Sequence, residues 1–187
     1  MEIVGFEAAG KMFDALKAGA WDAAFLAIDP GRAAEVDFTE PYVEIEGTYL
    51  FPPESKLSGI ADVDRDGVRV GVSGGSAYEL FLTRSLERAR LVRAPTPDAA
   101  FSLILSGQAD VLAGVRQHLV ANSAKLPGAR VLDERFMAIQ QALGIPKGRD
   151  QAANYLQEFI NEVKASGFVA RALDKHGIRG VSVPPVR

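Results

Sequence analysis

The 187-residue chain contains no cysteine, only two histidines and a single tryptophan. The lack of cysteine excludes a disulfide-stabilised scaffold, a cysteine-ligated zinc site and a thiol nucleophile. No strong excess of either charge is present, because 24 acidic and 21 basic side chains give a formal charge of −3. This balance argues against a broad nucleic-acid interface. The longest apolar runs, such as residues 23–28, are far too short to cross a bilayer.

The composition is that of a folded chain, with 48% hydrophobic and 24% charged residues. This mixture excludes a disordered chain. The length allows one large domain or two small ones, and either could bury a substantial core.

Strand and helix patterns alternate along most of the chain. Strands are predicted at residues 3–6, 23–28, 44–51, 68–72, 90–93, 111–113, 130–132 and 137–145. The continuous apolar run 23–28 has the pattern of a strand covered on both faces. Helices are predicted at 8–18, 76–88, 97–105 and 117–124, in a segment capped by Asp150 and ended by Gly167, and at 168–176. Gly19 is expected to stop the first of these helices, and Thr96 and Pro97 are expected to form the cap and first position of the helix at 97–105. Residues 181–187 are predicted to be a loose tail. The pattern predicts an α/β protein with mainly parallel sheets, and the turn-rich stretch 52–67 suggests two lobes.

Two loops at predicted strand ends could bind an anion. In the first, residues 72–77, Gly75 permits close approach of the backbone, while Ser76 and Ala77 begin a helix whose free N–H groups and dipole attract negative charge. The alternative is that Ser76 only caps this helix. The loop lacks the Lys-Ser or Lys-Thr of a P-loop.

The second loop, residues 27–32, follows the buried run and carries Arg32 close to the strand end. A guanidinium group pairs naturally with a carboxylate ligand. The alternative is a surface ion pair of Arg32 with Glu35 or Asp37. Two anion-seeking loops in separate lobes, both at strand ends, favour ligand binding more strongly than either loop does alone.

Residues 29–42, DPGRAAEVDFTEPY, strongly resemble the signature of the polar-amino-acid binding proteins, the family 3 solute receptors of bacterial ABC importers. Residues 70–79 and 106–110 resemble two further segments of this family, and residues 164–168 resemble its final helix pair. The resemblance follows the family order along nearly the whole chain.

The resemblance implies a two-lobed, type II-like periplasmic-binding-protein fold that traps a small carboxylate-bearing solute between its lobes. Lobe 1 would comprise 1–46 and 140–187, lobe 2 would comprise 51–135, and the hinges would lie near 46–50 and 136–140. Arg32 would grip the ligand carboxylate, the backbone at Ala27 and Asp29 would add contacts, and Gly75, Ser76 and Ala77 would complete the site. The membrane subunits of an importer would be the partners, and the location would be periplasmic.

Two departures from the family pattern affect these expectations. Val115 stands where the family commonly has an aspartate that binds the ligand ammonium. Either the ligand lacks an α-ammonium, or the charge is supplied by another group such as Asp29 or by a residue that is not in this chain. Arg116 beside it could bind a second anionic group or lie at a surface helix start. A family strand and helix of about 35–45 residues would also precede Glu2, which leaves lobe 1 incomplete. We therefore expect exposed apolar surface and self-association, with exchange of elements between copies as one form.

The chain is predicted to be a binding protein and not an enzyme, with no cofactor and no metal site. His118 and His176 lie far apart in the sequence and lack partners at metal-ligand spacing. The alternative class is a cyclohexadienyl or arogenate dehydratase on the same fold, for which Glu44, Glu46, Glu79 and His118 are the candidate proton donors. A third alternative is a truncated remnant that binds nothing.

Overall fold

The computed structural model describes residues 2–186 and divides into two compact units. Unit 1 comprises residues 2–5, 12–45 and 139–186, and unit 2 comprises residues 6–11 and 46–138. Strands β3 (Val43–Phe51) and β8 (Met137–Pro146) both contribute residues to each unit, and so does helix α1 (Ala9–Asp14).

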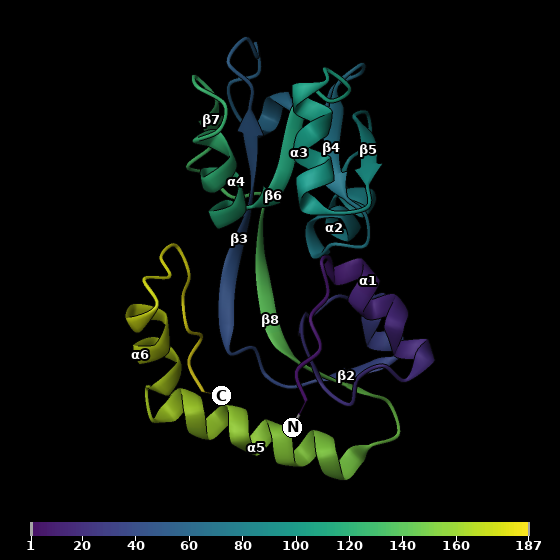
Figure 1. Ribbon diagram of the computed structural model, residues 1–187, viewed down its shortest axis with the longest axis vertical. Helices are drawn as coiled ribbons and strands as arrows, with labels where there is room; N and C mark the ends of the chain where they lie inside the picture. The colour runs from purple at the N-terminus through teal and green to yellow at the C-terminus, as the bar shows by residue number, and fades with distance from the viewer. Residues whose placement is uncertain (1, 187) are drawn as a thin grey trace. The chain divides into compact units, whose positions relative to one another are not determined.

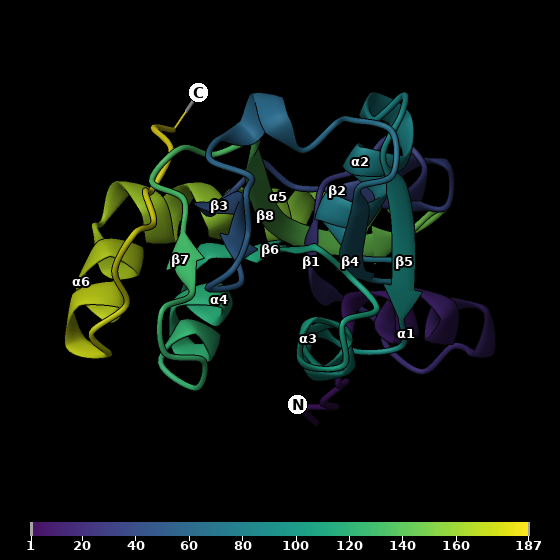
Figure 2. The ribbon, with the colours of Figure 1, turned by 90° about the horizontal axis from the view of Figure 1, so that it is seen from above.

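Unit 2 is a sheet covered by helices. Strand β4 (Arg69–Ser73) pairs in parallel with β5 (Arg90–Ala94) and β6 (Val111–Val115), and both views show β4 and β5 side by side (Figures 1 and 2). The sheet continues from β6 to the antiparallel β3, which also pairs with β7 (Arg130–Val131). Its other elements are α2 (Ala77–Ser85), α3 (Pro97–Leu105), α4 (Arg116–Ser123) and the 3-10 turn η3 (Ile60–Asp62).

The core of unit 2 lies between the sheet and helices α3 and α4. Its members are buried apolar side chains that project from β3, β5, β6, both helices and the loop before β6, namely Leu50, Ala94, Ala100, Phe101, Ile104, Ala109, Leu112 and Leu119. Burial of a leucine or phenylalanine of this kind stabilises the fold by roughly 1.5–3 kcal/mol. This core holds the carboxyl ends of β4, β5 and β6 at one edge of the sheet.

Unit 1 is built on β8, which pairs in antiparallel fashion with β1 (Ala24–Ala27) and β2 (Val36–Phe38). Its helical elements are α5 (Asp150–Ala165), α6 (Phe168–Lys175) and the 3-10 turns η1 (Ala15–Ala18) and η2 (Arg32–Ala34). Gly19 ends η1 with a φ of 66°, which confirms the predicted glycine stop. Trp21 is buried and its Nε1 donates to the Met12 carbonyl at 2.8 Å, so the side chain packs rather than binds ligand.

Helix α3 confirms the predicted capping signal. It spans Pro97–Leu105, and the Thr96 hydroxyl accepts a hydrogen bond from the Ala99 amide at 3.2 Å. Pro97 occupies the first turn, where its missing N–H group costs nothing. The predicted bounds are therefore those of the structure.

Three predictions about strands are wrong. Residues 3–6 form no strand, because their apolar side chains find no sheet: Ile3 is 85% exposed. The sheets are not mainly parallel, because β3 and β8 pair antiparallel with their neighbours. The run 23–28 is also not covered on both faces, since Phe25 is 67% exposed.

The two predictions for the C-terminal region also need correction. Asp150 is the first residue of α5 rather than its cap, and the capping position falls on Arg149. The tail is tied down, because the backbones of Ser182 and Glu44 exchange hydrogen bonds of 2.8 and 3.0 Å. The Lys164 ammonium also donates to the Pro185 carbonyl at 3.0 Å.

Candidate functional site

In unit 1, the loop after β1 is shaped by Asp29. The Asp29 carboxylate accepts a hydrogen bond from the Gly31 amide at 2.8 Å, and its carbonyl accepts one from the Ala33 amide at 2.9 Å. These bonds form an Asx-type turn that leads the chain into η2. Arg32 begins η2 and is thereby directed back toward the end of the strand.

Arg32 is 2% exposed and Asp29 is 3% exposed, so the predicted alternative of a surface ion pair for Arg32 is wrong. Its Nη1 donates to the Ala27 carbonyl at 2.9 Å, and its guanidinium carbon lies 6.0 Å from the centre of the Phe13 ring. Burial lowers the pKa of Arg32, and the nearby Asp29 carboxylate offsets part of this decrease. A guanidinium remains protonated in proteins, so the side chain is a buried cation beside a buried carboxylate.

In unit 2, the loop between β4 and α2 places Gly75, Ser76 and Ala77 together. Gly75 has a φ of 70°, and the Ser76 hydroxyl accepts a hydrogen bond from the Glu79 amide at 3.1 Å. Ser76 is therefore a helix cap, as one alternative predicted. Ligand binding by Ser76 stays a prediction.

Glu79 adds a negative charge to this loop. Its carboxylate accepts from the Gly75 amide at 3.2 Å and from Arg93 Nε at 2.8 Å. Glu79 is buried, whereas the Arg93 side chain is half exposed. The Gly75 amide is thus committed to Glu79, and the arginine compensates for the burial of that carboxylate.

Val115 and Arg116 lie at the junction of β6 and α4. Val115 ends the strand and contributes no side-chain cap to the helix. Arg116 donates to the Glu46 carboxylate at 2.5 Å and to the carbonyls of Leu132 and Asp133 at 2.6 and 2.7 Å. These bonds give Arg116 a structural role in unit 2, while ligand binding by either residue stays a prediction.

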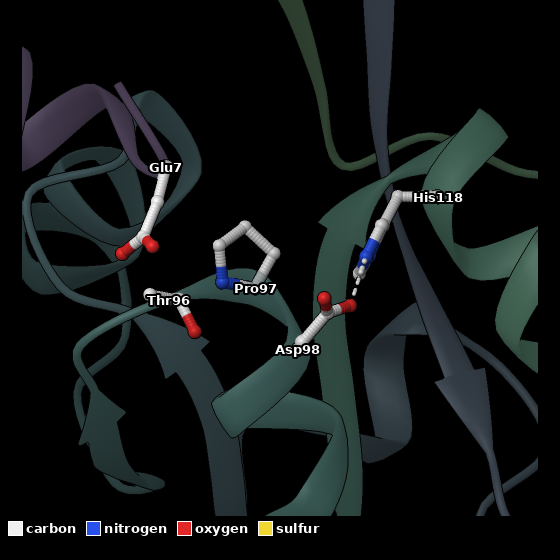
Figure 3. Close-up of a pocket in the computed structure, with 5 residues that line it drawn as sticks. All are labelled: Glu7, Thr96, Pro97, Asp98 and His118. Carbon is white, nitrogen blue, oxygen red and sulfur yellow. Dashed lines mark hydrogen bonds and ion pairs between the residues drawn. The ribbon is translucent and has the colours of Figure 1, made fainter. Parts of the chain in front are cut away.

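A pocket of about 450 Å³ lies within unit 2 at the N-terminal ends of α3 and α4 (Figure 3). Its lining residues are Glu7, Thr96, Pro97, Asp98 and His118. His118 Nε2 lies 3.2 Å from the Asp98 carboxylate. The buried Asn122 amide nitrogen lies 3.2 Å from His118 Nδ1.

The sequence reading missed this pocket, although one signal for it was present. Thr96 and Asp98 follow β5 as Ser76 follows β4, and parallel neighbouring strands bring such loops to one edge of the sheet. Glu7 gave no comparable signal, because only the fold brings it near α3. The Glu7 carboxylate accepts from Lys11 at 2.7 Å, and this hydrogen bond lowers the pKa of Glu7.

The described residues include no group of three or more histidine, cysteine, aspartate or glutamate side chains placed to hold a metal ion. Within residues 2–186, none of the helices has the length and apolar character needed to span a membrane.

Comparison with known proteins identifies one family. The sequence pattern described as bacterial extracellular solute-binding proteins, family 3, matches residues 2–178. A glutamine-binding protein of Geobacillus stearothermophilus is 25% identical over 136 residues, which are 73% of this chain and 50% of that protein. The chain therefore spans about half the length of this curated relative.

Solved structures show the same fold. An ancestral amino-acid-binding protein, a precursor of cyclohexadienyl dehydratase, is 25% identical with a TM-score of 0.76, over 93% of this chain and 76% of that one. A binding component of an ABC transporter from Wolinella succinogenes, complexed with lysine, is 22% identical with a TM-score of 0.77, over 93% and 77%. The predicted mixed α/β, two-lobed type II-like fold class is confirmed.

Proposed function

Because the chain belongs to the bacterial extracellular solute-binding proteins, family 3, we propose that it binds a small carboxylate-bearing solute for an ABC importer. The solute is an amino acid or a related organic acid. The glutamine-binding relative supports the amino-acid class. The proposal includes a location outside the cytoplasmic membrane and contact with the importer's membrane subunits.

The observation that carries the carboxylate assignment is the buried Arg32. Placing a guanidinium at 2% exposure is costly, and the cost is lowest when hydrogen bonds and an opposite charge surround the group. A ligand carboxylate can accept two parallel hydrogen bonds from such a planar group. Asp29, whose carboxylate lies near Arg32, is the group we assign to a ligand ammonium in place of Val115.

Unit 2 supplies the second set of proposed contacts through Gly75, Ser76 and Ala77. Strands β3 and β8 carry the chain between the units, so residues 46–50 and 136–140 are the proposed hinges. A solute that contacts both units would select the closed arrangement by differential affinity.

A second candidate function is a dehydratase-like elimination, favoured by one observation. Of the four predicted proton donors, His118 lines a pocket, where it lies beside Asp98. Glu46 is paired with Arg116, and Glu79 is paired with Arg93. The backbone of Glu44 is bonded to Ser182. Turnover of prephenate by the purified protein would replace binding with this function.

Self-association is a further part of the proposal. A pocket of about 590 Å³ in unit 1 is lined by apolar side chains of β1, α5 and α6, and among them Phe25 and Phe168 are 67% and 58% exposed. A second copy of the chain could cover these rings. Light scattering at micromolar concentration tests this, and a monomeric mass would contradict it.

The central experiment is thermal unfolding across a panel of amino acids, dicarboxylates and aromatic acids. A solute at about 100 times its Kd should stabilise the protein by roughly 2.7 kcal/mol. A panel in which no compound raises the midpoint would refute the binding function for this chain and favour the non-binding remnant.

A further inference from the structure

The segment Phe6–Lys11 has an unusual place in the fold. It belongs to unit 2, whereas the residues on either side of it, 2–5 and 12–45, belong to unit 1. Helix α1 is therefore divided, with 9–11 in unit 2 and 12–14 in unit 1. The chain makes a brief excursion into unit 2 before β1 begins.

Within unit 2, Gly10 of this segment packs directly against the backbone of Gly74 and Gly75. A Cβ atom added to Gly10 would lie 2.7 Å from the Gly74 carbonyl oxygen and 3.1 Å from the Gly75 Cα. A Cβ atom added to Gly75 would lie 2.7 Å from the Gly10 Cα. All these neighbours are backbone atoms, so the two segments approach with no room for a side chain.

Helix propensity does not explain Gly10. Within a helix, glycine is less favourable than alanine by about 1 kcal/mol. The close approach to Gly74 and Gly75 supplies the reason for glycine at this position, because any larger residue would push the segment away from the loop. Gly75 has the separate requirement of its positive φ.

The same segment forms a wall of the pocket in unit 2 (Figure 3). Glu7, three residues before Gly10, lines this pocket opposite Thr96, Asp98 and His118. The pocket also adjoins the glycine loop, because the Gly74 amide donates to the Ala94 carbonyl at 2.9 Å, two residues before Thr96. Docking of Gly10 on Gly75 therefore fixes the position of the wall that carries Glu7.

We propose that Phe6–Lys11 is a strap whose glycine contact with Gly74 and Gly75 completes a solute pocket in unit 2. This inference rests on the proposed function, and it adds that the pocket receives a hydrogen-bond-donating group of the solute, remote from its carboxylate. The wall groups that accept such bonds are the carboxylates of Glu7 and Asp98 and the hydroxyl of Thr96.

The strap also constrains motion. Because unit 1 residues flank it on both sides, the chain crosses between the units at each end of the strap, in addition to the crossings within β3 and β8. Any change in the relation of the units must bend the chain at both ends of the strap or break the glycine contact. Solute binding in the pocket holds the strap in place.

The test is Gly10→Ala, with Gly5→Ala as the matched control. A Cβ atom at Gly5 would meet nothing within 4 Å. Alanine at position 10 favours helix α1, so any loss of docking comes from the clash. Overpacking of this size weakens a contact enough to raise the Kd for a bound solute about tenfold. We expect this rise, together with faster hydrogen exchange of residues 6–11, in Gly10→Ala alone.

Each result is decisive for one claim. Equal hydrogen exchange in Gly10→Ala and the wild type overturns the strap, even if no solute binds. Faster exchange with unchanged affinity overturns the pocket assignment, while the proposed function stands if Arg32→Ala abolishes binding. Glu7→Gln removes a wall charge from an exposed side chain. We expect it to weaken binding of donor-bearing solutes about fivefold at an unchanged midpoint, and an unchanged affinity would contradict the pocket assignment.

Discussion

Replacement of Arg32 by alanine tests both the architecture of unit 1 and the proposed carboxylate contact. The substitution leaves the Ala27 carbonyl without the hydrogen bond that Arg32 donates at 2.9 Å. It also removes the cation beside Asp29, which is 3% exposed. Losing one partner of a buried pair destabilises a protein by about 3–5 kcal/mol, because the remaining charge stays buried without compensation.

The expected change in thermal stability follows from this loss. In a domain of this size, 1 kcal/mol corresponds to about 2–4 °C in the melting temperature. Arg32→Ala should therefore lower the melting temperature of the transition that involves unit 1 by about 10 °C, followed by circular dichroism. Arg149→Ala is the matched control, since its side chain is 48% exposed and its partner Asp22 is 91% exposed. The control should change the melting temperature by less than about 3 °C.

Solute affinity is the second readout of the same variant. Loss of a charge-assisted hydrogen bond of about 1.5–3 kcal/mol should weaken binding at least tenfold. Arg32→Lys separates charge from geometry, because it keeps the cation near Asp29 but cannot form the planar two-bond contact. We expect Arg32→Lys to recover most of the stability and little of the affinity. Wild-type affinity in Arg32→Ala would refute the carboxylate assignment, and an unchanged melting temperature would refute the account of Arg32 burial.

Substitutions at three further positions address unit 2. Ser76→Ala removes the cap of α2 and should destabilise the unit by about 1 kcal/mol in urea unfolding, whereas Ser76→Asp should keep the cap. The Asp64 carboxylate accepts backbone hydrogen bonds from Ala89, Arg88 and Glu87, and these bonds lower its pKa. The ionised carboxylate therefore stabilises the folded state fully above the unfolded pKa near 4, and this stabilisation is lost as the pH falls through the lower folded pKa. Asp64→Asn should remove this contribution and make the free energy of unfolding less dependent on pH below about pH 4. An equally steep acid profile in that variant would contradict this role. Arg116→Met should cost about 2–3 kcal/mol of stability through the lost bonds to Glu46 and two carbonyls, and a selective loss of solute affinity at unchanged stability would instead make Arg116 a ligand residue.

Local signals in the sequence predicted those elements whose ends are decided locally. Thr96 and Pro97 specify the start of α3 through a hydroxyl cap and a missing N–H group. Gly19 ends η1 because its left-handed backbone favours glycine. The same local reasoning failed at residues 3–6, since an apolar run becomes a strand only when another strand is available to pair with it.

In the candidate site, too, local features could be predicted from the sequence and contacts between distant residues could not. The position of Arg32 after a strand was readable from the sequence, whereas its burial depends on Asp29, Ala27 and Phe13 in three dimensions. The pocket joins Glu7 to Asp98 and His118, which lie 91 and 111 positions later in the chain, and no spacing rule relates them. The antiparallel pairing of β8 likewise depends on strands that lie more than a hundred residues earlier in the chain.

The bridge between Ser182 and Glu44 connects the C-terminal segment to strand β3. Glu44 lies two residues before the point where β3 passes from unit 1 into unit 2. Two backbone hydrogen bonds therefore hold the C-terminal segment against the part of β3 that belongs to unit 1. Trimming the chain before Ser182 would remove no predicted ligand contact, yet it would remove both of these backbone hydrogen bonds from Glu44. Residues 182–185 are therefore held to β3 and α5 within unit 1, at a place that includes no proposed ligand-binding residue.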